Sequence, residues 1–144
     1  MKRRTLLQSL PAAALLPAVN SVSKFSVAAR PDSGAVYELR VYHAAEGKLQ
    51  DLLRRFREHT VALFEKHGMH VVAFWTPVDE PAKSNTLLYV LAHPSREAAT
   101  ANWKSFQEDQ EWVSVRTASE VNGKLVDKVD VTFMTLTDFS PKLA

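Results

Sequence analysis

The first residues that could do chemistry are the polar side chains of a short alternating segment, residues 36–43. Glu38, Arg40 and Tyr42 occupy every second position of this segment. Alternation with a period of two is typical of a β-strand, so the three side chains share one face. Such a row could line a cavity that orients a small polar or aromatic ligand. It could instead form a buried Glu38–Arg40 ion-pair network that sets the register of a dimer. An open cavity would favour the first interpretation and a sealed network the second.

Three further residues are candidates for the lining of the same cavity. His43 and His93 lie at the ends of predicted strands, where a cavity could open. Trp75 belongs to another predicted strand and could border the same space, although it could also be an aromatic anchor of the core. The candidate ligand-binding residues are Glu38, Arg40, Tyr42, His43, Trp75 and His93.

The sequence contains no catalytic or metal-binding motif. Its five histidines form neither H-E-x-x-H nor H-x-H, and His67 is expected in a structural role at a helix C-terminus. There is no serine elbow and no glycine-rich phosphate loop. The absence of cysteine excludes disulfides, thiolate catalysis and iron–sulfur clusters. We therefore predict no catalytic residue, no metal and no cofactor.

The charge of the 144-residue chain is unevenly distributed. Four of the 18 basic residues, and none of the 16 acidic residues, lie in residues 1–29. The remaining chain has 14 basic and 16 acidic residues, so it has no excess of positive charge for a phosphate backbone. We expect no nucleic-acid partner.

Residues 1–29 are predicted to be a signal peptide. Arg3 and Arg4 precede a short, alanine-rich apolar run that two prolines interrupt, which is too short to span a bilayer. The paired arginines resemble a twin-arginine export motif; a general secretory signal with two chance arginines is the alternative. Residues 30–35 are predicted to be a linker. We expect an exported protein, periplasmic or extracellular, without a membrane span after the signal is removed.

The pattern of the remaining chain predicts one domain over residues 36–141. An amphipathic helix is expected over residues 46–67, with Arg54, Arg55 and Arg57 on its solvated face. Strands are expected over residues 69–76, 86–92 and 128–138. The second helical region starts at the N-cap Ser95 and is expected to break near Asp109, which is a fresh N-cap.

The order β-α-β-β-α-β predicts an α+β, ferredoxin-like fold, in which both helical regions cover one face of a four-stranded antiparallel sheet. Three of the strands are apolar on both faces, as in a sheet that is buried on both sides. A second copy of the chain is the simplest cover, which predicts a homodimer whose two sheets face each other. Glu38, Arg40 and Tyr42 are expected in the space between those sheets.

An ordered set of short segments resembles the NIPSNAP family of the dimeric α/β-barrel superfamily. It begins with Tyr37-Glu38-Leu39-Arg40-Val41-Tyr42 and Gly47-Lys48-Leu49, and ends with Phe139-Ser140-Pro141. Between them lie Lys66-His67-Gly68, Ala73-Phe74-Trp75, Ala101-Asn102-Trp103 and Asp109-Gln110-Glu111-Trp112. The resemblance implies a dimeric α/β barrel of the exported bacterial type. It supplies no catalytic residues.

Two functions follow as hypotheses. The first is a non-catalytic, exported homodimer that binds a small molecule or a protein partner. The alternative is a cofactor-independent or haem-linked monooxygenase-like enzyme, by analogy with other dimeric α/β barrels.

Overall fold

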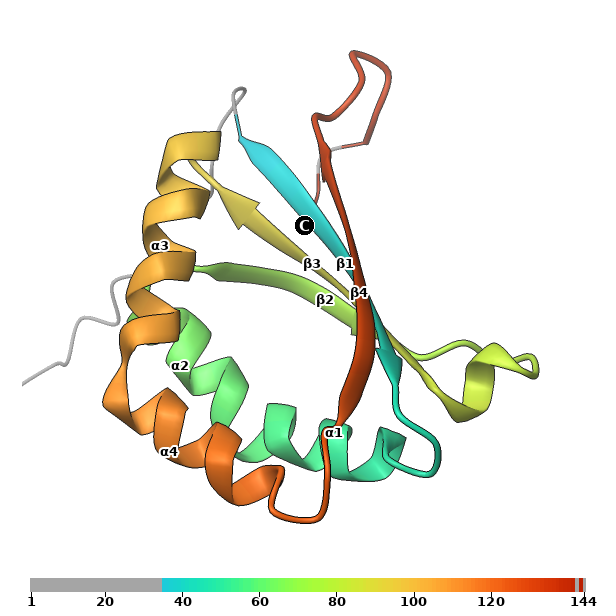
Figure 1. The fold of residues 1–144 in the computed structure, drawn as a ribbon. Coiled ribbons are helices and arrows are strands. Elements are labelled where there is room, and N and C mark those ends of the chain that lie inside the picture. Colours follow the sequence, from blue (N-terminus) through green and yellow to red (C-terminus); the bar gives the residue numbers. More distant parts are fainter. Residues whose placement is uncertain (1–34, 142, 144) are drawn as a thin grey trace, which may run out of the picture.

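The computed structural model describes residues 35–141 and 143, so the predicted signal peptide and residues 30–34 of the linker lie outside the described residues. Four strands form one antiparallel sheet in the order β2-β3-β1-β4 (Figure 1). The strands are β1 (Val36–Ala44), β2 (His70–Trp75), β3 (Thr86–His93) and β4 (Val126–Met134). The helices pack against one face of this sheet. The predicted ferredoxin-like βαββαβ fold is confirmed.

The first helical region runs from Leu49 to Lys66, but a wider turn divides it. It comprises α1 (Leu49–Arg55), the π-helical turn η1 (Phe56–Thr60) and α2 (Val61–Lys66). In the turn, the Val61 N–H donates to the carbonyl of Phe56, and the Thr60 hydroxyl donates to the carbonyl of Arg55 at 3.3 Å. The π-helical turn accommodates one extra residue without breaking the helix. The regular 3.6-residue period of the sequence therefore gives no sign of it.

The first helical region begins at Leu49, three residues later than expected, but it ends, and the second region begins, at the residues that the sequence indicates. Gly68 has a φ of +70°, and the following Met69 N–H donates to the carbonyl of Phe64, which closes the first region. Ser95 accepts from the Ala98 N–H at the start of α3 (Arg96–Glu108). Asp109 accepts from the Glu111 N–H at the start of α4 (Gln110–Ser119), so the predicted break is confirmed.

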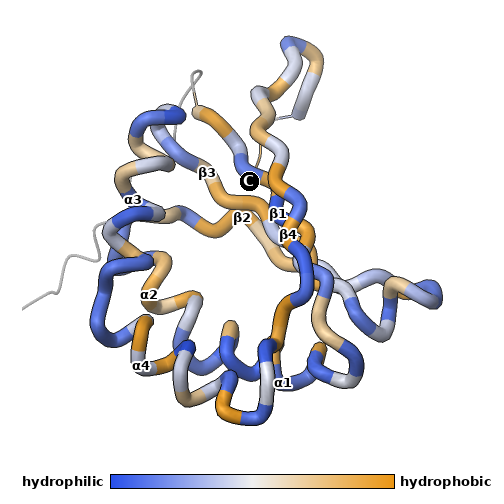
Figure 2. Tube along the Cα trace, viewed as in Figure 1, coloured by the Kyte–Doolittle hydropathy of each residue, from blue (hydrophilic) through white to orange (hydrophobic). Residues whose placement is uncertain are grey.

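The main core lies between the sheet and these helices. Figure 2 shows hydrophobic stretches along the strands, whereas the helices change between hydrophobic and hydrophilic along their length. Aromatic rings dominate the centre of this core: the rings of Phe56 and Phe64 each lie within 6 Å of Tyr89, with centroid distances of 5.3 and 5.8 Å. Among the described residues, no helix is both long and apolar enough to cross a membrane.

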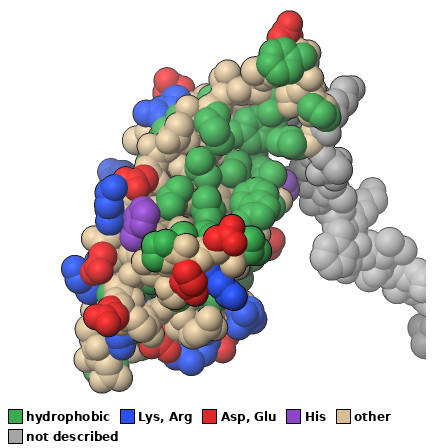
Figure 3. Space-filling view, turned by 90° about the vertical axis from the view of Figure 1, so that its right-hand side faces the viewer, with side chains coloured by type: hydrophobic (Ala, Val, Ile, Leu, Met, Phe, Trp, Pro, Cys, Tyr) green, Lys and Arg blue, Asp and Glu red, His purple; other side chains and the backbone are tan. Residues whose placement is uncertain are grey.

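The other face of the sheet is apolar and carries none of these helices. Figure 3 shows hydrophobic side chains gathered over this side of the molecule. Its residues include Tyr37, Leu39, Val41, Leu88, Val90, Ala92 and Met134. We call this surface the outer face.

The last strand is shorter than expected over residues 128–138. β4 begins at Val126 and ends at Met134, which pairs with Tyr37 near the start of β1. Residues 135–138 lie outside the strand, and the pairing of β4 with β1 stops at Tyr37. A short 3₁₀ turn, η2 (Ala82–Ser84), lies in the loop before β3.

Candidate functional site

The polar row of β1 faces the helices, not the space outside the sheet. Tyr42 packs against Phe56 of the helical layer, and Arg40 lies over the Trp103 ring of α3. The prediction that Glu38, Arg40 and Tyr42 project between two sheets is therefore wrong. Alternation separates the two faces of a strand but does not determine which face the helices cover, and here they cover the polar row.

Glu38 is the centre of a buried hydrogen-bond network. Its side chain is fully buried and accepts hydrogen bonds from Arg40 Nε at 2.7 Å, Trp103 Nε1 at 2.7 Å and His93 Nε2 at 2.8 Å. Burial alone would raise the pKa of Glu38, but the hydrogen bonds from His93, Trp103 and Arg40 outweigh it and hold the pKa below its usual value. The network keeps a carboxylate charged inside the core.

The predicted Glu38–Arg40 ion pair is present within β1, and the contacts of both residues with Trp103 connect it to α3 of the same protomer. The Arg40 guanidinium lies 3.7 Å from the centre of the Trp103 ring, while its Nε is bonded to Glu38. These two contacts fix the plane of the guanidinium. Its terminal nitrogens are left for another partner.

A cavity of about 870 Å³ opens beside this network, between β1 and β4 of the sheet and α3 and α4. Arg40 and Tyr42 lie on its sheet side, and Trp103 and Trp112 lie on its helix side. The other lining residues are Arg55, Phe106, Gln107, Val113, Arg116, Thr117, Glu120, Lys124, Val126, Asp127, Lys128 and Val129.

Arg55 reaches the cavity from the end of α1 and is buried, in contrast to its predicted solvated position. Its Nη1 donates to Ser119 Oγ at 3.2 Å and to Glu120 Oε1 at 3.0 Å, and its guanidinium lies over Trp112 at 5.2 Å. Its Nε is buried without a hydrogen-bond partner among the described residues. The prediction failed because α4 packs along this side of α1, a contact that the period of α1 alone does not show.

The six predicted ligand-binding residues separate into three groups. Arg40 and Tyr42 line the cavity. Glu38 and His93 meet directly behind Arg40 but are fully buried and are not among the lining residues. The remaining two, His43 and Trp75, lie elsewhere.

His43 and Trp75 lie on the outer face. His43 Nε2 contacts Asp130 Oδ2 at 2.9 Å at one end of that face. Trp75 is 49% exposed and pairs with Leu88, so it neither lines the cavity nor anchors the core of this protomer. A register shift between Val71 and Ala73 in β2 contributes to this placement, because it changes which residues point to each face.

Trp103 is the principal site residue that sequence reasoning missed, because its spacing on α3 is equally typical of core packing. A buried indole N–H requires an acceptor, and the row of polar residues on β1 contains a carboxylate that can accept it. That requirement was the available signal.

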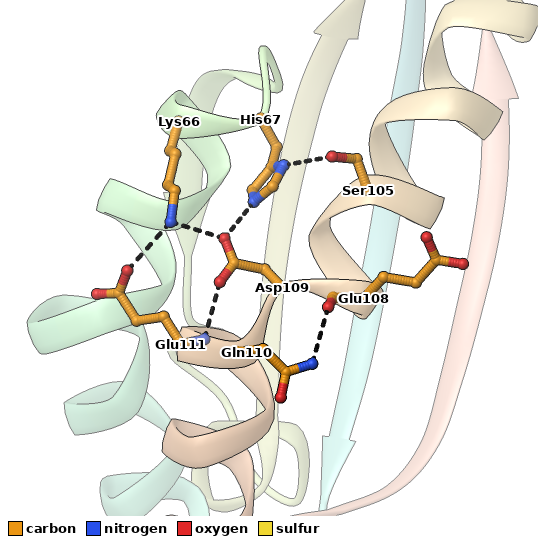
Figure 4. Close-up of polar contacts among 7 residues, drawn as sticks. All are labelled: Lys66, His67, Ser105, Glu108, Asp109, Gln110 and Glu111. Atoms are coloured by element: carbon orange, nitrogen blue, oxygen red, sulfur yellow. Dashed lines mark hydrogen bonds and ion pairs between the residues drawn. The ribbon is translucent and has the colours of Figure 1, made fainter.

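A second polar cluster joins α2 to the α3–α4 junction (Figure 4). His67 contacts Ser105 Oγ through Nδ1 at 2.8 Å and Asp109 Oδ2 through Nε2 at 2.7 Å. Lys66 Nζ contacts the same Asp109 oxygen at 2.7 Å. Hydrogen bonds from Lys66 and His67 hold the pKa of Asp109 well below its usual value.

Serine, histidine and aspartate are the residue types of a hydrolytic triad, but here they connect α2 to the α3–α4 junction. Ser105 lies within α3, where backbone N–H groups are used by the helix and cannot form an oxyanion hole. None of the three residues lines the described cavity. Among the described residues, no group of three His, Asp or Glu side chains is arranged to hold a metal ion.

Comparison with known proteins identifies the family. No protein with a curated description matches the chain. A NIPSNAP-like domain protein from Burkholderia xenovorans, itself uncharacterised, is 13% identical; the match covers 78% of this chain and 93% of that one, with a TM-score of 0.66. A NIPSNAP family protein from Agrobacterium tumefaciens is 21% identical over 74% of this chain and 97% of that one, with a TM-score of 0.65.

A more distant structure shares the fold. SnoaB, a cofactor-independent oxygenase from Streptomyces nogalater, is 14% identical over 76% of this chain and 99% of that one, with a TM-score of 0.50. At such identities the structural matches show the fold alone. The NIPSNAP family model, however, matches residues 37–141, which is most of the sequence, and the chain belongs to the NIPSNAP family.

Proposed function

We propose that this NIPSNAP protein is an exported homodimer that binds a small molecule in a cavity within each protomer and does not catalyse a reaction on it. The cavity beside the Glu38 network carries the proposal. Its volume of about 870 Å³ suits a small organic ligand, for which sites of roughly 300–1,000 Å³ are common. Arg40 and Trp103 are held in place at its wall by Glu38, so the site is formed before a ligand arrives.

The outer face supports the homodimer. Its residues contribute apolar side chains from all four strands, and Trp75, one of the largest, is 49% exposed. A surface of this kind on a sheet is typical of an interface, and a second copy offers a matching one. The ligand site and the proposed interface then lie on opposite faces of the same sheet.

Export rests on residues 1–29. Their paired arginines and short apolar run are the features of a signal, and the folded domain begins at Val36, a few residues beyond them.

The enzymatic alternative has no specific support from the site. Glu38 and His93 are the pair that could move a proton, but both are fully buried and neither lines the cavity. The two carboxylates that do line it are paired, Glu120 with Arg55 and Asp127 with Lys124.

The test is native mass spectrometry of the mature protein recovered from the compartment to which it is exported. We expect a dimer that lacks the signal and carries, or takes up from a cell extract, a small non-covalent mass. Val129→Trp should fill the cavity and remove that mass. Val131→Trp is the matched control, because Val131 lies on the same face of β4 but not in the lining. An added mass that persists in Val129→Trp, or a wild-type dimer that takes up nothing, would contradict the proposal.

A further inference from the structure

The charge of the cavity lining points to the class of ligand. Five lining residues are cationic and two are acidic. The cations are Arg40, Arg55, Arg116, Lys124 and Lys128, and the acids are Glu120 and Asp127. The Lys128 ammonium pairs with Asp130 at 2.8 Å on the outer face, which leaves four cations facing the cavity. The lining is therefore positive although the chain without residues 1–29 is slightly negative. This contrast favours an anionic ligand.

Two of these cations are fixed in place: Arg55 is buried and Arg40 is half-buried. Arg40 donates its Nε hydrogen bond to Glu38 and stacks on Trp103, so its terminal nitrogens remain for a ligand. Arg55 is 5% exposed at its side chain, bonds to Glu120 through Nη1 and keeps a buried Nε without a partner among the described residues. Because protein atoms enclose this Nε, an anion in the cavity would bind Arg55 through the other nitrogens of its guanidinium.

The rest of the wall is aromatic. Tyr42, Trp103, Phe106 and Trp112 line the cavity together with the arginines. The cavity is also far larger than an inorganic anion requires. Flat aromatic side chains bind a flat apolar body, and guanidinium groups bind an oxyanion in a defined orientation.

We infer that the cavity binds a planar organic anion, an aromatic or conjugated carboxylate or sulfonate whose charged group is held by Arg40 and Arg55. This inference rests on the proposed ligand-binding function and adds the chemistry of the ligand to it.

The probes are two dyes of the same shape that differ in charge. One is 8-anilinonaphthalene-1-sulfonate, an anion, and the other is N-phenyl-1-naphthylamine, which lacks the sulfonate. Dye can bind in the cavity or on the apolar outer face. The fluorescence from the cavity is the part that Val129→Trp abolishes and Val131→Trp retains. We expect the cavity to bind the anion at least about tenfold more tightly than the neutral dye, the gain typical of one charge-assisted hydrogen bond.

Variants then separate charge from shape. Arg40→Lys keeps a positive charge that can pair with Glu38 but loses the planar guanidinium. Arg55→Gln removes a positive charge, and Arg116 remains as a partner for Glu120. Each should weaken the anionic dye about tenfold and leave the neutral dye nearly unchanged. If either variant fails to fold, Arg116→Gln tests the rim, because Arg116 lines the cavity and is exposed. Lys104→Gln is the control, since Lys104 is an exposed cation of α3 outside the lining.

Each outcome has one meaning. If neither dye gives a signal that depends on Val129, the proposed function fails, and the inference fails with it. If both dyes bind the cavity equally, or the anion is insensitive to the arginine variants, the cavity binds ligands but not organic anions. Inorganic sulfate that competes as strongly as 1-naphthoate would overturn the requirement for a planar body.

Discussion

Glu38 determines the polar chemistry of the interior at the level of single residues. One buried carboxylate accepts hydrogen bonds from a strand neighbour, from α3 and from the end of β3. Without it, the half-buried Arg40 Nε and Trp103 N–H would lose their acceptor. The cost of an unpaired buried group is greater than the gain from pairing it, so this carboxylate is needed even if the pair itself adds little.

Glu38→Gln should lower the free energy of unfolding by about 3 kcal/mol at pH 7, the usual effect of removing one partner from a buried ion pair. The pKa of Glu38 is lowered in the folded state, so its contribution is present above its unfolded pKa of about 4.3 and is lost as the pH falls through the folded value. The variant should therefore lose less stability than the wild type between pH 7 and pH 3. Urea unfolding at both pH values measures this, with the exposed Glu46→Gln as control. Equal acid sensitivity of the variant and the wild type would contradict it.

At the level of helices and strands, Asp109 is a carboxylate that joins several elements. It begins α4 and also joins the α3–α4 junction to the end of α2 through Lys66 and His67 (Figure 4). The N-cap and the ion pairs are separable, because asparagine is also a good N-cap but carries no charge.

Asp109→Asn should therefore keep α4 and loosen its connection to α2. Because the pKa of Asp109 is depressed in the folded state, its contribution is present above the unfolded pKa of about 3.9 and is lost as the pH falls through the folded value. We expect a lower melting temperature at pH 7 than the wild type, a smaller difference at low pH, and faster amide exchange at the end of α2. Ser105→Ala, which removes only the second contact of His67, should have a smaller effect. Unchanged exchange in α2 with a normal α4 signal would show that the cluster does not connect these elements.

The helices and strands also show how much of the fold could be predicted from the sequence. The order of elements, the central place of β1 and the break at Asp109 follow from local signals: alternation, glycines, prolines and caps. The inward face of β1, the burial of Arg55 and the exposure of Trp75 do not. The face of β1 depends on where the helices pack, the burial of Arg55 on the contact between α1 and α4, and the exposure of Trp75 on the register shift in β2. A local period contains no information on such features, nor on the π-helical turn Phe56–Thr60. The candidate site was therefore found through Arg40 and Tyr42 but placed on the wrong side of the sheet.

At the level of the whole molecule, the sheet separates the cavity from the outer face. The cavity is lined by residues of one protomer on the helix side, and the outer face is apolar. A ligand site between two sheets would have made binding depend on dimerisation. The observed arrangement instead predicts that dimerisation can be abolished without abolishing ligand binding, and the reverse.

Leu39→Arg should test this separation. Leu39 and its β3 partner Val90 lie on the outer face and are half-buried in the single chain, so an arginine there can reach solvent in the monomer. In a dimer of facing sheets the same arginine would be buried without a partner, and we expect the dimer dissociation constant to rise at least about 100-fold, since such a burial costs several kcal/mol. Sedimentation velocity measures the dissociation constant, and the exposed Thr100→Arg on α3 is the control. Because Arg40 and the other lining residues lie on the opposite face, the monomeric variant should still bind the anionic dye with nearly the wild-type affinity. A dimer that Leu39→Arg leaves intact would remove the outer face as its interface, and dye binding lost together with the dimer would show that the partner completes the cavity.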